Sequence, residues 1–554
     1  MTDDAGAVDR GLRGLGVSPG RAAGPVVRMA APPVLPPPGT AHSERTVGEG
    51  LAAVADELEA RAARAGGAAG EILEAQAMMA ADPMLREAAE DLVKEGLDPA
   101  HALDAAFATH REALVAAGGY FAERAADLDD LRNRAVAAVL GLPMPGVPDP
   151  GHPFVLVAED LSPADTAGLS GDVLALVTEK GGPTSHTAIL ARGRGLPAVV
   201  ACEGALGLAE GALVAVDGGS GEVVAGLEPG EVARIQAEAA AERTRLSGSR
   251  GPGRTADGHP VKLLLNIGSA ADLEVEDLGA GAEGVGLFRT ELLYLGRRST
   301  PGFDEQVAAY AAVFRACPDV VVRTLDAGTD KPLPFLDLPD EPNPALGIRG
   351  LRVDRLRPEV LDTQLAALAE AARATGTEPS VMAPMVATAA EAAAFAERAR
   401  AAGIARVGVM IEVPAAALLA AEILAEVDFL SIGTNDLGQY TFAADRQHPG
   451  LADLLDPAQP ALLRLVELCA SAGRTAGKPV GVCGEAAGDP RLAPILAGLG
   501  VTSLSMSAVA LPAVREALAG HTLEACQELA REALSGRRYQ RSAVVTCGPG
   551  RGGP

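Results

Sequence analysis

The sequence predicts a multidomain α/β protein whose C-terminal half is a (β/α)8 barrel. Its 554 residues suggest three or four compact domains at roughly 150 residues each. Hydrophobic residues make up 48% and charged residues 22%, which is ordinary for a globular protein with packed cores. Beyond residue 260, eight apolar runs alternate with helix-length segments, and this spacing is typical of the barrel.

The barrel strands are expected where these apolar runs fall. A helix-length segment follows each run, as a barrel of parallel strands requires. The runs read KLLLNIG, GVGLFRTE, DVVVRTLDAG, SVMAPMV, RVGVMIEVP, DFLSIGTND, KPVGVCGEA and TSLSMSA.

The N-terminal half predicts a small α/β domain interrupted by helices. The opening LGVSPGRAAGPVVR is typical of a strand, a tight turn and a second strand. Residues 44–140 are rich in Ala, Leu, Glu and Arg at helical spacing, with Asp-Pro pairs at 82 and 98 as helix breaks. Five short apolar runs then follow, from FVLVAEDL to EVVAG. We therefore expect a helical bundle inserted into a sheet domain.

Composition changes set the expected boundaries. The segment SGSRGPGRTADG has no apolar periodicity and predicts a flexible linker over 246–258, after a helix that begins near residue 229. The final RSAVVTCGPGRGGP predicts a disordered tail. The expected units are the α/β domain at 1–29 and 144–229, the helical insertion at 30–143, the linker helix and flexible linker at 230–258, the barrel at 259–538 and the tail at 539–554.

Charge and cysteine usage exclude several classes of function. The net charge of −26 disfavours nucleic acid as a partner, since phosphate backbones need clustered Lys and Arg. The six cysteines form no C-x-x-C pair, which argues against a disulfide framework or a zinc site. The acidic start has no signal-peptide pattern, and no apolar run reaches about 18 residues. We expect a cytoplasmic protein without membrane insertion.

One candidate for chemistry is a histidine in GGPTSHTAILARGRGLPAVVA, residues 181–201. Thr184 and Ser185 predict a helix N-cap, so His186 would lie in the first turn. A phosphate on His186 would meet free backbone N–H groups and the positive end of the helix dipole, and the hydroxyls of Thr184, Ser185 and Thr187 are near. Neutral imidazole is also a competent nucleophile. A surface helix start explains the same pattern, and local spacing does not separate the two.

A second candidate lies at the ends of the predicted barrel strands. Catalytic residues of such barrels sit at the C-terminal ends of the strands, and charged groups there fit packing poorly. The strand ends carry Arg289, Arg323 with Asp326, Glu412, Asn435 with Asp436, and Cys483.

These residue types predict an anion site with a metal. Guanidinium groups suit phosphate and carboxylate, which makes Arg289, Arg323 and Arg446 candidate clamps, with Lys331 and Arg349 as additions. Glu412 and Asp436 are hard oxygen donors suited to Mg²⁺, and Asn435 offers an amide to the same ligands. The thiol of Cys483 is mostly protonated near pH 7 and can donate a proton, although a cysteine in a strand is often an inert core residue.

Together the motifs resemble enzyme I of the bacterial phosphoenolpyruvate-dependent sugar phosphotransferase system. The resemblance covers nearly the whole chain and is weakest in the helical insertion and the tail. The motifs occur in the order found in that family: GGPTSHTAILAR, GVGLFRTELLY, RTLDAGTDKPLP, NPALGIRGLR, IEVPAA, SIGTNDLGQYTFAADR, VCGEAAGD and SLSMSA.

The resemblance implies a role for each matching position. His186 would be phosphorylated on Nε2, and Cys483 would protonate the enolate so that pyruvate leaves. Phosphoenolpyruvate would bind through Arg289, Arg323, Asn435, Asp436 and Arg446, with Lys331 and Arg349 as additions, and Mg²⁺ would bind to Glu412 and Asp436.

The resemblance also implies an architecture and partners. A swivelling phosphohistidine α/β domain with an inserted helical bundle would precede the TIM barrel. The phosphocarrier HPr would dock on the insertion, and the chain would form a homodimer through the barrel. Three positions depart from the family pattern: Pro183, Thr329 and the segment 447–450.

Two alternatives use the same residues. Pyruvate phosphate dikinase and phosphoenolpyruvate synthase share the histidine domain and the barrel, but they need a nucleotide-binding domain of some hundreds of residues before the histidine. Only about 180 residues precede His186, and most of them are predicted to be helical. A regulator that binds phosphoenolpyruvate without catalysis would be expected to lack the reactive residues, and His186, Glu412, Asp436 and Cys483 are all present.

Overall fold

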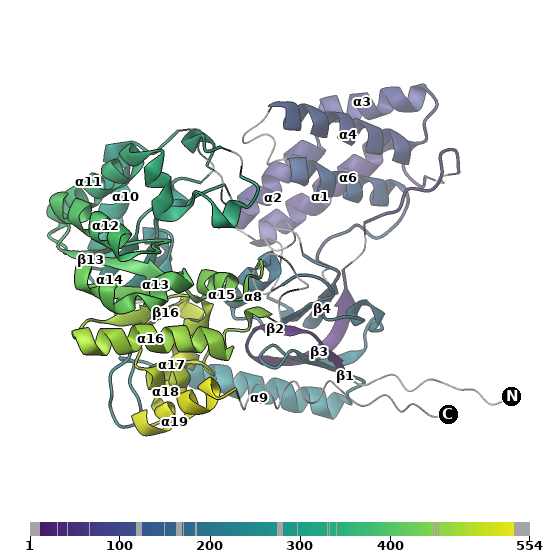
Figure 1. Ribbon diagram of the computed structural model, residues 1–554. Coiled ribbons are helices and arrows are strands. Elements are labelled where there is room, and N and C mark those ends of the chain that lie inside the picture. Colours follow the sequence, from purple (N-terminus) through teal and green to yellow (C-terminus); the bar gives the residue numbers. More distant parts are fainter. Residues whose placement is uncertain are drawn as a thin grey trace, which may run out of the picture. The chain divides into compact units, whose positions relative to one another are not determined.

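A computed structural model describes the protein (Figure 1). It divides into two compact units, Met1–Ala239 and Ala240–Pro554, and each is described by itself. The predicted tail at 539–554 lies outside the described residues. The described part runs from 11 to 536 and omits 30–31, 41–42, 66, 118–124, 149, 162–164, 166–168, 170, 183–184, 274–280, 296, 298, 330, 332, 340, 447, 449–450 and 452–453.

The first unit contains an eight-stranded sheet, which includes the seven strands expected from the sequence and one more, β1. The strand order is β1-β8-β7-β3-β4-β5-β6-β2. The central strands β3, β4, β5 and β6 run parallel, and antiparallel strands flank them. The bounds are β1 Gly11–Arg13, β2 Leu15–Ser18, β3 Arg21–Arg28, β4 Phe154–Ala158, β5 Val173–Thr178, β6 Ala198–Val200, β7 Leu213–Asp217 and β8 Glu222–Ala225.

A helical bundle interrupts this sheet in the chain. It lies between β3 and β4, which are hydrogen-bonded neighbours, so the helices form an insertion between adjacent strands. The side chains of Leu58, Leu103 and Leu131 are buried in its core. Asp82 caps one helix by accepting a hydrogen bond from the Met84 N–H at 2.8 Å, as its Asp-Pro pair predicts. The helices are α1 Val47–Ala65, α2 Gly67–Ala80, α3 Pro83–Lys94, α4 Pro99–Ala117 and α6 Ala125–Val139 (Figure 1).

The second unit confirms the predicted barrel. Eight parallel strands close in the order β10-β11-β12-β13-β14-β15-β16-β9, and each of the eight predicted apolar runs contains one of them. The strands are β9 Lys262–Ile267, β10 Val285–Arg289, β11 Val320–Arg323, β12 Ser380–Ala383, β13 Arg406–Ile411, β14 Phe429–Ile432, β15 Val480–Val482 and β16 Ser503–Met506.

Helices pack around the barrel strands, coloured green to yellow in Figure 1. They bury one continuous apolar core with the outward side chains of the strands. The helices are α10 Phe303–Ala316, α11 Pro358–Thr375, α12 Ala389–Ala401, α13 Pro414–Leu418, α14 Ala420–Glu426, α15 Thr434–Phe442, α16 Pro460–Ala476, α17 Ala493–Leu499, α18 Leu511–Ala519 and α19 Leu523–Leu534.

The segment predicted as a flexible linker makes hydrogen bonds to residues of the barrel unit. After helix α9, Pro229–Ser247, the guanidinium of Arg515 donates to the backbone oxygens of Ser249 and Gly251 at 3.1 and 2.8 Å. The Gly253 N–H donates to Glu283 at 2.9 Å. A Cβ added to Gly253 would lie 2.1 Å from the backbone oxygen of Val261, the residue before β9. The glycines therefore allow close packing here, although their composition is also that of a linker.

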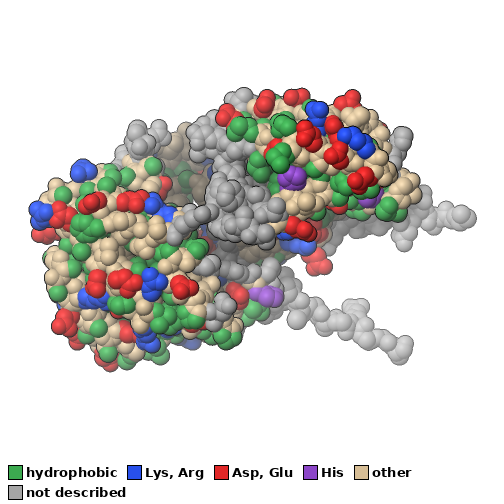
Figure 2. Space-filling view, turned by 90° about the horizontal axis from the view of Figure 1, so that it is seen from above, with side chains coloured by type: hydrophobic (Ala, Val, Ile, Leu, Met, Phe, Trp, Pro, Cys, Tyr) green, Lys and Arg blue, Asp and Glu red, His purple; other side chains and the backbone are tan. Residues whose placement is uncertain are grey.

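Charged side chains of both signs lie on the described surface. On the face seen in Figure 2, the described Lys and Arg side chains are scattered among Asp and Glu and do not gather into a patch. Within the described part of the chain, no helix is both long enough and apolar enough to span a bilayer.

Candidate active site

The predicted polar strand ends meet at one mouth of the barrel, because the carboxyl ends of parallel strands share an edge. Arg289 and Arg323 are the last residues of β10 and β11. Glu412 follows β13, and Cys483 follows β15. Asn435 and Asp436 lie in the first turn of α15 after β14.

Arg323 is a buried guanidinium among carboxylates. Its Nη2 lies 2.5 Å from Glu291 Oε1, and its Nη1 lies 3.1 Å from Asp326 Oδ2 and 3.8 Å from Glu412 Oε1. The Nε of Arg323 and Oε2 of Glu291 are buried and have no hydrogen-bond partner among the described residues. A buried donor without a partner costs free energy, so the site retains capacity to bind an anion.

Asp326 gathers three cations and is fully buried. Its Oδ2 lies 2.7 Å from Lys331 Nζ, 3.1 Å from Arg323 Nη1 and 3.5 Å from Arg349 Nη2. Burial alone would raise the pKa of Asp326, but the charges of Arg323, Lys331 and Arg349 outweigh it and hold that pKa below its ordinary value. The sequence singled out Asp326 as a strand-end group without giving it a role. The structure makes it the centre of the cation cluster.

Arg349 and Asp436 form a paired clamp. Arg349 Nη1 and Nη2 each lie 3.0 Å from one oxygen of Asp436, and the Arg349 side chain is buried. Arg446 Nη1 adds a contact of 3.4 Å to Asp436 Oδ2. Such fork-to-fork geometry fixes the orientation of the carboxylate. Arg349 thus holds Asp436 in one orientation.

Glu412 is a buried carboxylate with acidic neighbours. Burial first, and then the charges of Asp326 and Asp436, raise the pKa of Glu412 to about 7. Its Oε2 accepts a hydrogen bond from the Met385 N–H at 2.9 Å. Met385 has φ of 60°, a left-handed conformation that is uncommon for a non-glycine residue and is found at functional sites.

These carboxylates fit a divalent cation. Glu412 and Asp436 supply hard oxygen donors, and their mutual repulsion raises the pKa of Glu412, which a bound cation would relieve. Among the described residues, no group of three or more His, Cys, Asp or Glu side chains is arranged as a metal cluster. Two hard carboxylates suit a divalent cation that completes its shell with substrate oxygens and water.

Cys483 and Asn435 lie at neighbouring strand ends. The thiol of Cys483 is buried and donates to the Ile432 oxygen at 3.6 Å, and burial raises its pKa to about 11. The nearby positive charge of Arg289 opposes that rise. Asn435 Oδ1 accepts from the Glu485 N–H at 3.0 Å, which leaves the amide NH₂ for a ligand. Arg289 is exposed, and no ion pair of its guanidinium occurs within the described part of the chain.

The loop around Thr329 is pinned close to Arg349. The Thr329 hydroxyl donates to Glu341 Oε2 at 2.7 Å, and both oxygens of Glu341 accept from the Ile348 N–H at 2.9 and 3.0 Å. Thr329 therefore has a structural partner, and its departure from the family pattern is accommodated. Of the other departures, Pro183 and most of 447–450 lie outside the described residues.

The candidate phosphohistidine begins a helix in the first unit. His186 is the first residue of α8 His186–Arg194, and Ser185 is its N-cap, accepting from the Ala188 N–H at 3.3 Å. The Thr187 hydroxyl is buried and donates to Asp160 Oδ1 at 3.2 Å, so it serves the fold; we had expected it to face a phosphate. Thr184 and the side chain of His186 lie outside the described residues.

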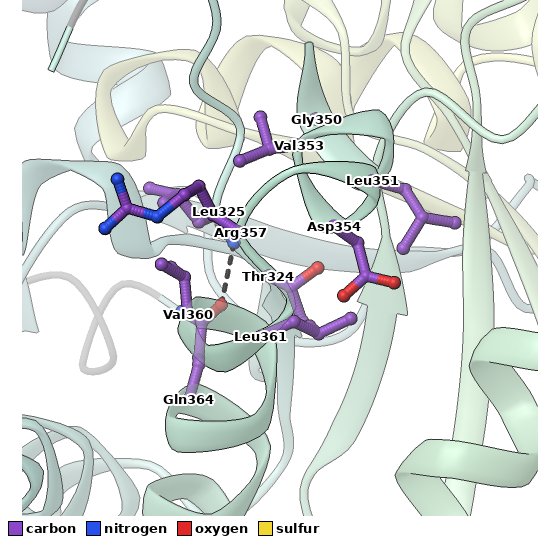
Figure 3. A pocket seen from close by; sticks show the side chains of 10 residues that line it. All are labelled: Thr324, Leu325, Gly350, Leu351, Val353, Asp354, Arg357, Val360, Leu361 and Gln364. Carbon is purple, nitrogen blue, oxygen red and sulfur yellow. Dashed lines mark hydrogen bonds between the residues drawn. The ribbon is translucent and has the colours of Figure 1, made fainter. Parts of the chain in front are cut away.

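A small pocket elsewhere on the barrel unit does not belong to this site. Its charged lining residues are already paired, Asp354 with Arg398 at 2.5 Å and Arg357 with Glu359 at 2.7 Å. The Leu325 N–H donates a hydrogen bond to Gln364 Oε1 at 2.9 Å, drawn as the dashed line in Figure 3. The pocket is lined by Thr324, Leu325, Gly350, Leu351, Val353, Asp354, Arg357, Val360, Leu361 and Gln364 (Figure 3).

Known proteins that are similar to this chain match it over most of its length. A protein of Streptomyces coelicolor named phosphoenolpyruvate-protein phosphotransferase is 54% identical over 94% of this chain and 96% of its own length. This chain belongs to the phosphoenolpyruvate-protein phosphotransferase family. Family members from Haloferax volcanii and Bacillus subtilis are 40% and 37% identical, each over 95% of this chain and 97% of its own length.

Three domain families of PEP-utilising enzymes match separate parts of this chain. The PEP-binding domain matches 245–523, which includes every candidate residue of the barrel mouth. The mobile domain matches 150–221, which includes His186, and the N-terminal domain matches 13–124.

Proposed function

We propose that this phosphotransferase moves the phosphoryl group of phosphoenolpyruvate to Nε2 of His186 and then to a histidine of HPr, releasing pyruvate and energising sugar uptake. The observation that carries the proposal is the barrel mouth, where buried cations and carboxylates converge beside a buried thiol. Phosphoenolpyruvate carries a phosphate and a carboxylate, and both anions need guanidinium or ammonium partners.

Substrate binding is assigned to groups at the barrel mouth. Arg289 is exposed at the mouth, and the Nε of Arg323 is buried without a described partner. Asp326 holds Arg323 and Lys331 in place, while Arg349 orients Asp436. The amide of Asn435 and the guanidinium of Arg446 complete the proposed contacts. Mg²⁺ bound by Glu412 and Asp436 would neutralise the charge on the substrate's oxygens.

Two side chains carry out the proposed reaction, His186 as the nucleophile and Cys483 as the proton donor. Neutral Nε2 of His186 attacks phosphorus, the N–P bond forms, and the bond from phosphorus to the enol oxygen breaks with its electron pair left on the enolate. The Cys483 thiol gives its proton to the methylene carbon, which yields pyruvate, and the thiolate regains a proton from water. With the pKa of Cys483 raised to about 11, the thiol stays protonated at neutral pH until the enolate forms.

The proposal also includes a protein partner, a cellular compartment and an oligomeric state. HPr would dock on the helices of 30–143, and the chain would act in the cytoplasm as a homodimer formed through the barrel. Transfer requires His186 to reach the barrel mouth and then the partner during each cycle.

Incubation of the full chain with ³²P-labelled phosphoenolpyruvate and Mg²⁺ tests the reaction. We expect acid-labile label on the protein, release of pyruvate, and loss of the label to added HPr. Pyruvate release without label on the protein would contradict the proposal. Formation of phosphoenolpyruvate from pyruvate and ATP would assign the chain to the nucleotide-dependent enzymes.

Cys483→Ala separates the two halves of the reaction. We expect label transfer to His186 to survive better than pyruvate release, which should fall about 100-fold because general-acid catalysis contributes that order of rate. Quenched-flow kinetics, with separate assays of protein-bound label and of pyruvate, measure both rates. Cys469→Ala, which removes a thiol buried in the barrel's outer core, is the control and should leave both rates unchanged. An equal loss of label and pyruvate in Cys483→Ala would argue against the acid role.

A further inference from the structure

A buried hydroxyl links the ends of the two strands that carry Arg289 and Arg323. Thr290 follows Arg289 directly and is fully buried. Its Oγ1 donates to the backbone oxygen of Arg323 at 2.8 Å. The link therefore joins the backbones of two predicted substrate ligands that lie 34 residues apart in the sequence (323 − 289). It adds a side-chain hydrogen bond to the strand pair just where the backbone ladder of β10 and β11 ends.

Gln364 of α11 sets the direction of that hydrogen bond. Its Oε1 accepts from the Leu325 N–H at 2.9 Å, so its amide nitrogen must face the other way. The Nε2 group donates to Thr290 Oγ1 at 3.0 Å and to the Tyr310 hydroxyl at 3.1 Å. Because Thr290 Oγ1 accepts from Gln364, its own hydrogen is directed to the Arg323 oxygen. Figure 3 shows Gln364 on its helix in the same view as Leu325 and Thr324, which directly follow Arg323.

The rest of the network is anchored away from the strand ends. The Tyr310 and Tyr294 hydroxyls both donate to Gln306 Oε1, at 3.1 and 2.9 Å. The Gln306 amide nitrogen donates to the Pro301 oxygen at 3.0 Å. All of these groups are buried, where fully satisfied polar networks fix a single geometry.

We propose that Thr290 is a positioning residue that fixes the spacing of Arg289 and Arg323 for phosphoenolpyruvate, with Gln364 orienting its hydroxyl. Thr290 touches no substrate in this scheme and acts through the backbone of both arginines. The inference rests on the proposed function, since it assumes that these arginines bind the substrate. It predicts that the hydroxyl matters more for substrate affinity than for the stability of the barrel.

The test measures phosphoenolpyruvate binding by calorimetry in the full-length His186→Ala chain with Mg²⁺, where no turnover occurs. Thr290→Val keeps the branched shape and removes the hydroxyl, and we expect Kd to rise about fivefold or more. Thr290→Ser keeps the hydroxyl and should restore Kd to within about twofold. Gln364→Met breaks the same link from the other side, should raise Kd in the same way, and serves if Thr290→Val does not fold.

Tyr294→Phe is the matched control within the same network. It removes a hydroxyl bonded to Gln306 while Tyr310 still satisfies that oxygen. We expect a lower melting temperature with Kd unchanged. An unchanged Kd in a folded Thr290→Val, or an equal rise in Tyr294→Phe, would overturn the inference. Failure of the His186→Ala chain itself to bind phosphoenolpyruvate would instead contradict the proposed function.

Discussion

Replacing His186 with alanine should abolish the acid-labile label that we expect phosphoenolpyruvate to leave on the protein. The histidine begins α8, where the positive end of the helix dipole favours an attached anion. No other group in the proposed reaction can hold the phosphoryl group, so we expect transfer to fall by about a million-fold, as when other enzymes lose a nucleophile. Phosphorimaging of the labelled chain under alkaline conditions, which preserve phosphohistidine, measures the loss.

The control for this variant is His152→Ala. His152 is an exposed histidine of the same unit whose Nδ1 lies 3.1 Å from the Pro153 oxygen, and nothing in the proposed reaction uses it. Its labelling should match that of the wild type. Label retained by His186→Ala would show that another residue accepts the phosphoryl group and would contradict the assignment.

Replacing Asp326 with asparagine should be the most destabilising single change in the barrel mouth. The side chain of Asp326 is completely buried and faces Arg323, Lys331 and Arg349. Breaking such a buried arrangement from one side leaves uncompensated charge, which costs about 3–5 kcal/mol. The cations would also lose their common anchor, so we expect phosphoenolpyruvate turnover to fall by about 100-fold. Urea unfolding and steady-state kinetics measure the two effects.

An exposed carboxylate provides the comparison for Asp326. Asp91 pairs with Lys94 on the surface of α3 at 2.8 Å, and both side chains are largely exposed. Exposed pairs contribute little, so Asp91→Asn should leave the unfolding curve and the kinetics unchanged. If Asp326→Asn were as stable and as active as Asp91→Asn, Asp326 would not be the centre of the cation cluster.

The sequence alone determined the barrel and the identity of most candidate residues. Eight apolar runs define eight strands because a barrel strand is buried on both faces and must be apolar nearly throughout. Where a run stops at Arg289, Arg323 or Glu412, the charged residue must lie at the barrel mouth. Parallel strands bring all such ends to one side, so the residues of the site could be predicted without coordinates.

The tertiary structure decided which of these residues contact one another. Arg349 and Asp436 are 87 residues apart, and nothing in their local sequence shows that they form a two-pronged pair. The role of Gln364 was also hidden, since a glutamine in a helix is usually exposed, and only the tertiary structure buries it beside Leu325, Thr290 and Tyr310. Two side chains pair only when folding brings them within about 3 Å of each other. The local sequence pattern does not indicate which side chains those are.

The same reason applies to the segment before the barrel. Glycine-rich sequence at 246–258 fits both a flexible linker and a chain packed closely on a neighbour, because the absence of Cβ permits either. Arg515, more than 250 residues away in the sequence, bonds the backbone at Ser249 and Gly251, and local composition does not indicate that contact. Sequence thus determined the strands and the chemistry at their ends. Contacts between distant residues determined the geometry, because they form only when the whole unit has folded.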